Sequence, residues 1–221
     1  MALDAIVFDF DGLILDTEWS VYQAIDEIYV EHGHQLDLEW WRTIVGTTGG
    51  GDWPARLESL VGRSLDHESL HERSIRRHRH LTASLDPLPG VVDLVEAAHA
   101  EGVRLAVASS SLTWWLESNL TRVGLFGRFD ALCGRDVVGG RAKPDPDVYL
   151  AALDSLGVEA TRAVAVEDSP HGVTAAKAAG MACVAVPNRI TAPGDFSAAD
   201  LVIDSLASLT LAELHQVVGG S

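Results

Sequence analysis

The sequence has few cysteines and no long apolar segment, and each shortage excludes a class of protein. Only two cysteines, Cys133 and Cys183, occur in 221 residues. This number excludes a disulfide framework and fits a reducing compartment. No apolar run approaches the about 18 residues of a membrane-spanning helix, and the N-terminus has no basic region followed by an apolar core, as a secretory signal would. The sequence therefore predicts a cytoplasmic protein that does not use a membrane.

Basic residues are scarce as well, and the balance of charge limits the partners. The chain has 32 acidic against 16 basic residues, a formal net charge of −16, and only two of the basic residues are lysines. This surplus argues against nucleic acid or an anionic membrane as a partner. It would also repel a phosphorylated substrate, so a site for one needs local cations. The 47% hydrophobic content predicts a globular chain, either one large domain or a domain with an insertion.

The first apolar run ends in a pair of carboxylates. Ala5–Phe8 reads as a short buried strand, and Asp9 and Asp11 follow it, just before Gly12. In open α/β sheets, ligands bind outside the carboxyl ends of the strands. Two like charges this close repel each other, so they need a cation or a proton between them. Oxygen ligands with room for water suit Mg²⁺.

Three later stretches add polar residues next to predicted strands or helices. Serines 109–111 follow an apolar run, Lys143 stands at a Pro-initiated helix start, and Glu167 and Asp168 follow another apolar run. Singly, such residues are usually a helix cap, a solvated lysine and a strand-end turn. Together they supply a phosphate cradle near a helix N-terminus, a positive charge and oxygen ligands for a cation. Phosphoryl chemistry needs all three.

In these four motifs, their order and their coverage of nearly the whole chain, the sequence resembles the haloacid dehalogenase (HAD) superfamily of aspartate-nucleophile phosphohydrolases. The resemblance implies an aspartyl-phosphate intermediate on Asp9, with Asp11 as general acid and base. It also implies that Lys143 offsets the charge of the nucleophile and the phosphoryl group. The remaining roles that it implies are phosphate binding by Gly12, Ser109, Ser110 and Lys143, and Mg²⁺ binding by Asp9, the Asp11 backbone carbonyl, Asp168 and, directly or through water, Glu167.

The periodicity of the chain changes twice. Between Asp16 and Asp86 it predicts helices only, and after Gly90 it alternates between helix and strand, which is typical of a doubly wound, mostly parallel sheet. The predicted helices are Thr17 to Gly33, about Leu38 to Val45, about Pro54 to Val61, about His67 to Leu85, Val91–Glu101, Leu112–Val123, Asp147–Leu156 and Gly172–Ala179. The later strands are Arg104–Ala108, Ala131–Cys133, Ala163–Val166, Cys183–Val186 and Leu201–Ile203.

The helical block is interpreted as an insertion because the resembled phosphatases carry a helical cap at this point. The predicted domains are an α/β core of residues 1–16 and 85–221 and an all-helical cap of residues 17–84. The linkers would lie near Ile14–Thr17 and Ser84–Pro89.

The cap should choose the substrate, and its Gly-rich loop at 46–53 is the segment expected to face the active site. We expect Thr47, Thr48 and Trp53, with Glu18, to contact the leaving group. A flexible interhelix linker is an equally good interpretation of this loop. The basic stretch 73–80 is assigned a solvated helix face and no site role.

Within the superfamily, the residues favour simple hydrolysis of a small phosphorylated metabolite such as a sugar phosphate. The alternative is a phosphotransferase like beta-phosphoglucomutase, but Val21 stands where that enzyme has a histidine, and Gly49 or a neighbour stands where it has an arginine. Phosphonoacetaldehyde hydrolase needs a cap lysine, which is absent here, and haloacid dehalogenases lack the second aspartate, Asp11. A receiver-type signalling domain is shorter, and a noncatalytic binding protein on the same scaffold would be expected to lose a motif. A monomer or weak dimer is expected.

Overall fold

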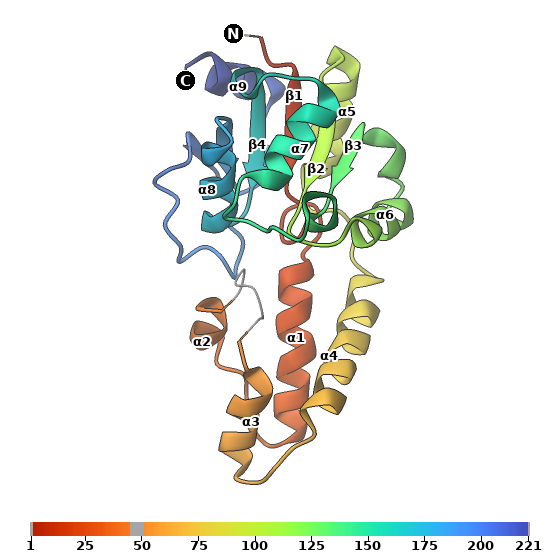
Figure 1. Ribbon diagram of the computed structural model, residues 1–221, viewed down its shortest axis with the longest axis vertical. Coiled ribbons are helices and arrows are strands. Elements are labelled where there is room, and N and C mark those ends of the chain that lie inside the picture. Colours follow the sequence, from red (N-terminus) through yellow and green to blue (C-terminus); the bar gives the residue numbers. More distant parts are fainter. Residues whose placement is uncertain (1, 45–50, 221) are drawn as a thin grey trace. The chain divides into compact units, whose positions relative to one another are not determined.

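The computed structural model describes residues 2–44 and 51–220, which form two compact units (Figure 1). One unit comprises Met1–Leu15 with Asp86–Ser221, and the other comprises Asp16–Leu85. The insertion expected at 17–84 begins and ends one residue inside the second unit. Thr47, Thr48 and Gly49 lie outside the described residues.

Within the described residues, six parallel strands form one sheet in the order β3-β2-β1-β4-β5-β6. The predicted doubly wound parallel sheet is confirmed. The first strand in the chain lies in the middle of the sheet, where Val7 pairs with Ala106 on one side and with Ala165 on the other. The strands are β1 (Ala5–Phe8), β2 (Arg104–Ala108), β3 (Ala131–Cys133), β4 (Ala163–Glu167), β5 (Ala182–Ala185) and β6 (Leu201–Val202).

Helices cover both faces of this sheet. On one face, α7 contacts β1, β2 and β3 while α8 contacts β4 and β5; on the other, α5 contacts β2 and α9 contacts β4 and β5. The strands under α7 and α8 are rich in buried alanine and valine, so the helices approach the sheet closely. The helices of this unit are α5 (Val91–Glu101), α6 (Thr113–Arg122), α7 (Asp147–Leu156), α8 (Pro170–Ala178) and α9 (Leu211–Gly219).

Two departures from the expected helices have identifiable causes. Helix α8 begins at Pro170, two residues before the predicted start, because Ser169 caps it and accepts a hydrogen bond from the Gly172 amide at 3.1 Å. Helix α9 was not predicted. It starts with a capping box in which Thr210 and Glu213 satisfy each other's backbone amides. This T-x-x-E pattern was the signal available in the sequence.

The second unit is helical, with α1 (Thr17–Glu31), α2 (Leu38–Arg42), α3 (Trp53–Val61) and α4 (His67–Thr82). Helices α1 and α4 pack against each other. Arg73 and Arg77 form ion pairs with Glu31, so part of the basic stretch 73–80 joins α4 to α1. No helix in the described part of the chain combines the length and the apolar character needed to cross a membrane.

Candidate active site

The carboxyl ends of three neighbouring strands bring the predicted motifs together. Phe8 pairs with Val107 of β2 and with Val166 of β4, so the residues that follow these strands come to one edge of the sheet. The Asp9 amide extends the ladder by donating to the Val166 carbonyl at 2.9 Å. Asp9, Ser109 and the pair Glu167 and Asp168 therefore lie at the same edge.

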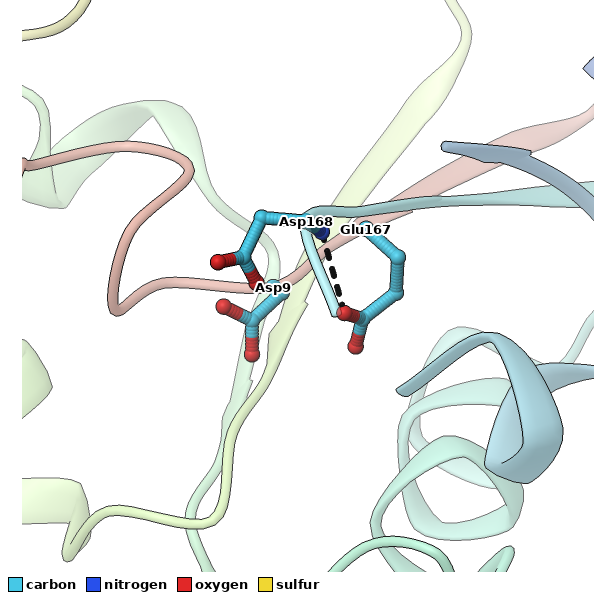
Figure 2. A group of neighbouring side chains, drawn as sticks. All are labelled: Asp9, Glu167 and Asp168. Carbon is cyan, nitrogen blue, oxygen red and sulfur yellow. Dashed lines mark hydrogen bonds between the residues drawn. The ribbon is translucent and has the colours of Figure 1, made fainter. Parts of the chain in front are cut away.

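Three of these acids form a buried cluster (Figure 2). One carboxylate oxygen from each of Asp9, Glu167 and Asp168 lies within 4.8 Å of the other two. The Lys143 ammonium contacts two members of the cluster, at 2.5 Å from Asp9 Oδ1 and 2.5 Å from Glu167 Oε1. All four residues are buried. The sequence motifs before and after the insertion thus meet in one polar centre.

The charges of this centre do not cancel. Burial raises the pKa of Asp9 well above its ordinary value; Lys143 opposes this rise and Glu167 adds to it. Burial alone would lower the pKa of Lys143, but the charges of Asp9 and Glu167 raise it on balance, so the ammonium stays protonated. With all three acids ionised, they and the Lys143 ammonium would carry a net charge of −2 in a buried space. A hard divalent cation fits this surplus and this oxygen donor set.

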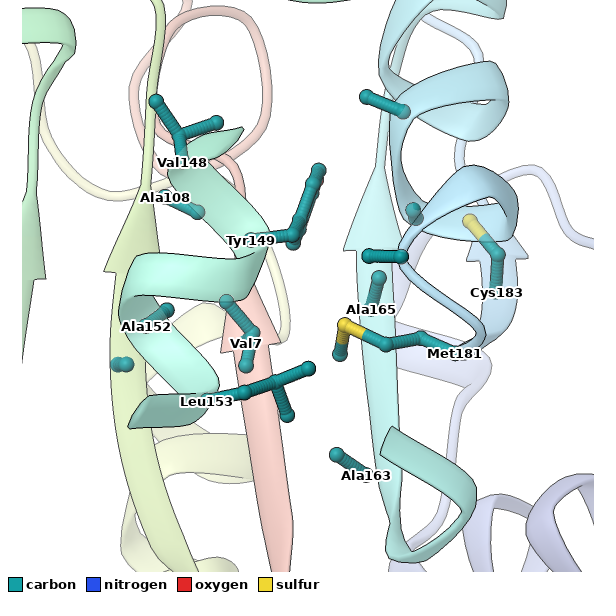
Figure 3. Close-up of a cluster of buried hydrophobic side chains, with 14 of the residues drawn as sticks. Val7, Ala108, Val148, Tyr149, Ala152, Leu153, Ala163, Ala165, Met181 and Cys183 are labelled. Carbon is teal, nitrogen blue, oxygen red and sulfur yellow. The ribbon is translucent and has the colours of Figure 1, made fainter. Parts of the chain in front are cut away.

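Both carboxylate oxygens of Glu167 accept hydrogen bonds. Its Oε1 accepts from Lys143 and, at 2.6 Å, from the Tyr149 hydroxyl, while its Oε2 accepts from the Asp168 amide at 3.1 Å and the Ser169 hydroxyl at 3.2 Å. Tyr149 is fully buried and also places its ring 4.9 Å from the Lys143 ammonium. Figure 3 shows Tyr149 on α7, among the buried side chains that pack on the sheet. The sequence reasoning missed Tyr149, because its spacing identifies only a buried helix face.

Gly172 makes room for the Glu167 carboxylate. A Cβ at Gly172 would lie 1.9 Å from Glu167 Cδ, far closer than any real contact. The glycine stands in the first turn of α8, where the sequence suggested only a helix start. Its lack of a side chain is therefore a condition for the acid cluster, and this role was also missed.

Gly12 has a structural role that the sequence did not indicate, and its contact with phosphate stays a prediction. Its φ is +89°, and its amide donates to the Leu15 carbonyl at 2.8 Å, which commits the amide to the loop. A Cβ at this position would lie 2.5 Å from Asp168 Oδ2 and 2.6 Å from Asn188 Nδ2. Gly12 thus leaves space for a hydrogen-bonded pair, in which Asn188 donates to Asp168 Oδ2 at 2.7 Å and to the Gly12 carbonyl at 3.2 Å. The role of Asn188 was not predicted.

The serine motif holds other site residues in place. The Ser110 hydroxyl accepts from the Lys143 backbone amide at 3.1 Å, which fixes the start of the lysine segment. The Ser109 hydroxyl accepts from the Ser111 amide at 2.9 Å and donates to Asp11 Oδ2 at 3.3 Å. Asp11 therefore lies beside the serine motif, and its side chain is not part of the cluster formed by Asp9, Glu167 and Asp168.

The predicted residues of the helical unit have mixed outcomes. Trp53 is only 3% exposed, its carbonyl accepts from the Tyr29 hydroxyl at 2.9 Å, and its ring lies against those of Tyr29 and His71. Trp53 thus packs inside the helical unit, and its contact with a leaving group stays a prediction. Glu18 lies in the first turn of α1.

Comparison with known proteins agrees with this geometry. Residues 6–186 match the family described as haloacid dehalogenase-like hydrolase. The chain is 40% identical over 212 residues to the protein YhcW of Bacillus subtilis, with 96% of each chain covered. It is 34% identical over 184 residues to the fructose-1-phosphate phosphatase YqaB of Escherichia coli, covering 82% of this chain and 95% of that one.

A solved structure shows the same fold with a ligand. A mutant of CbbY from Rhodobacter sphaeroides, in complex with xylulose-1,5-bisphosphate, is 34% identical and superposes with a TM-score of 0.78, covering 96% of this chain and 99% of that one. The family match spans all four motifs found in the sequence. The chain therefore belongs to the haloacid dehalogenase-like hydrolases, the family that these motifs resemble.

Proposed function

We propose that this protein is a Mg²⁺-dependent phosphatase that hydrolyses a small phosphomonoester, in particular a sugar phosphate, through an aspartyl-phosphate at Asp9. The observation that carries the proposal is the buried cluster of Asp9, Glu167 and Asp168 with Lys143 at 2.5 Å from two of its members. The names of two relatives, a fructose-1-phosphate phosphatase and a protein solved with a sugar bisphosphate, support the substrate class.

The reaction divides into two displacements at phosphorus. The Asp9 carboxylate attacks, the bond from phosphorus to the ester oxygen breaks, and Asp11 gives its proton to the departing alkoxide. Asp11, now ionised, takes a proton from a water whose oxygen attacks the aspartyl-phosphate. The bond between phosphorus and Asp9 then breaks, which releases inorganic phosphate and restores both carboxyl groups.

Most of the catalysis in such a site is positioning and neutralisation of charge. Lys143 holds Asp9 in place and offsets negative charge, while Ser109 would hold a phosphoryl oxygen. Asp9, the Asp11 backbone carbonyl and Asp168 would hold Mg²⁺, which would neutralise phosphoryl charge when bound. Glu167 already accepts hydrogen bonds at both oxygens, so it would act on the ion through water.

We further propose that the helical unit, residues 16–85, is a cap that selects the leaving group. Thr47, Thr48 and Glu18 are its candidate contact residues, on account of their polarity and position in the sequence. Thr48→Ala should lower kcat/KM for the preferred ester more than for a small ester such as glycerol phosphate. If the ratio of kcat/KM for the preferred ester to kcat/KM for the small ester is the same in wild type and variant, Thr48 does not contact the leaving group.

The experiment that tests the function is phosphate release from a panel of phosphorylated sugars, glycolate, glycerol and nucleotides. We expect release that requires Mg²⁺, stops on chelation and is abolished in Asp9→Asn. In Asp11→Asn given p-nitrophenyl phosphate, whose phenolate departs without a proton donor, an acid quench should trap the phosphoryl group on the peptide that contains Asp9. Release that persists without a divalent ion or in Asp9→Asn would refute the mechanism. Conversion of a sugar 1-phosphate to its 6-phosphate without net release would instead identify a mutase.

A further inference from the structure

The side chain of Asp11 is held at both oxygens by donors from a single segment of the chain. The Trp115 indole nitrogen Nε1 donates to Asp11 Oδ1 at 3.0 Å. The Ser111 hydroxyl donates to Oδ2 at 2.6 Å, and the Ser109 hydroxyl donates to the same oxygen at 3.3 Å. These three donors come from the loop after β2 and the first turn of α6. None of the four sequence motifs includes Trp115.

The segment that carries these donors is itself fixed. The amide and the hydroxyl of Thr113, the first residue of α6, donate to Asp136 Oδ1 at 2.8 and 2.9 Å. The Ser111 carbonyl accepts from the Arg135 amide at 2.9 Å. A Cβ at Gly134 would lie 2.5 Å from the Thr113 amide nitrogen, so the loop after β3 packs tightly on the start of α6. Trp115 and Ser111 thus extend from a rigid support.

The chemistry of the donors distinguishes the two oxygens of Asp11. An indole N–H can only donate, whereas a serine hydroxyl both donates and accepts. Oδ1 therefore remains a hydrogen-bond acceptor opposite the indole. Oδ2 is shared with hydroxyls that can turn, and it lies on the side of Ser109, the residue proposed to hold a phosphoryl oxygen.

We propose that Trp115, together with Ser111, is a positioning residue that orients the Asp11 carboxyl so that Oδ2 exchanges the proton with the leaving group. This inference rests on the proposed function, in which Asp11 is the general acid. Without the indole, the carboxyl group could rotate about its χ2 angle, and the proton donor would no longer be aligned with the ester oxygen. Substrate binding need not change, because Trp115 acts through Asp11.

The test compares two esters that differ in their need for a proton. The leaving group of a sugar phosphate is an alkoxide, which needs a proton from the general acid. The leaving group of p-nitrophenyl phosphate is a stable phenolate, which does not. In Trp115→Phe, which keeps a ring and removes the N–H, we expect kcat/KM for the sugar phosphate to fall roughly 10- to 100-fold. The value of kcat/KM for p-nitrophenyl phosphate should change much less. This constant reports the steps up to the first displacement, so the second displacement, in which Asp11 acts as a base for both esters, does not enter the comparison. Ser111→Ala should act in the same direction, and Asp11→Asn should give the largest loss in the ratio of the two rates.

Trp114→Phe is the matched control, because Trp114 is adjacent in α6 and 52% exposed. It should leave the ratio of the two rates unchanged. Equal losses on both esters in Trp115→Phe and Ser111→Ala would indicate a merely structural role and overturn the positioning proposal, as would an unchanged ratio in both variants while Asp11→Asn lowers it. If the wild type hydrolyses neither ester, the proposed function itself fails, and the role of Trp115 fails with it.

Discussion

Gly172→Ala adds one methyl group that has two opposing effects on stability, a gain in helix propensity and a clash with Glu167. In the first turn of a helix, alanine is favoured over glycine by up to about 1 kcal/mol, because it loses less backbone entropy. At this position, however, the new Cβ would lie 1.9 Å from Glu167 Oε1 and 2.0 Å from Oε2. The carboxylate must therefore move, and it is bonded to Lys143 and to the Tyr149 hydroxyl.

The magnitudes of these two effects decide whether the free energy of unfolding rises or falls. Overpacking of this kind costs about 1–3 kcal/mol, and the loss of one hydrogen bond to a charged group costs about 1.5–3 kcal/mol more. After the gain in helix propensity is subtracted, we expect the free energy of unfolding to fall by about 2–5 kcal/mol. For a chain of this size, that loss lowers Tm by roughly 4–20 °C.

The assay is urea unfolding of wild type and variant, with Gly127→Ala as the matched control. Gly127 has negative φ and no atom within 4 Å of a built Cβ, so its replacement should be neutral or stabilise by up to about 1 kcal/mol. Gly172→Ala should also lose phosphatase activity, since Glu167 holds Lys143. A Gly172→Ala protein with the wild-type midpoint and slope would refute the claim that the glycine makes room for the acid.

Two further predictions concern other hydrogen bonds. Asn188→Ala removes the donor to Asp168 Oδ2 and should weaken Mg²⁺ binding, measured by titration calorimetry, roughly 10- to 100-fold. The control is Thr191→Val, which removes only the acceptor for the Asn188 backbone amide, and equal Mg²⁺ affinity in all three proteins would contradict the role of Asn188. Burial raises the pKa of Tyr29 to about 12, so its stabilising effect is complete below pH about 10 and is lost as pH rises through 12. The stability advantage of wild type over Tyr29→Phe in urea should therefore shrink by about 1.4 kcal/mol between pH 8 and pH 11, and a constant difference would count against this assignment.

The sequence was informative where function follows from the ends of parallel strands. Asp9, Ser109, Glu167 and Asp168 each follow an apolar run, and such runs form strands whose carboxyl ends meet. Short-range periodicity also located the strands and most helices within a few residues. The packing roles of Gly12 and Trp53 were not predicted, because their neighbours come from distant segments. The sequence shows that each is small or aromatic, but not what fills the space beside it.

The supporting residues could not be predicted for the same reason. Trp115, Tyr149, Gly172 and Asn188 each act on one acidic side chain, and each is brought there by the packing of a helix or loop on the sheet. Trp115 is 104 positions from Asp11, and nothing in its local spacing separates it from the exposed Trp114. Side-chain direction in three dimensions, which the pattern of residues does not encode, decides these roles.

The central place of β1 has a consequence for the order in which the protein is made. Ala5 is synthesised well before Ala163, one of its partners in the sheet. The helical unit, whose contacts are local, can fold while synthesis continues, whereas β1 must wait with its backbone donors and acceptors unpaired. Asp9, the proposed nucleophile, thus acquires its acidic neighbours only after Asp168 has been synthesised. A nascent chain that stalls earlier would carry Asp9 without activity and would expose an apolar strand to aggregation or to chaperones.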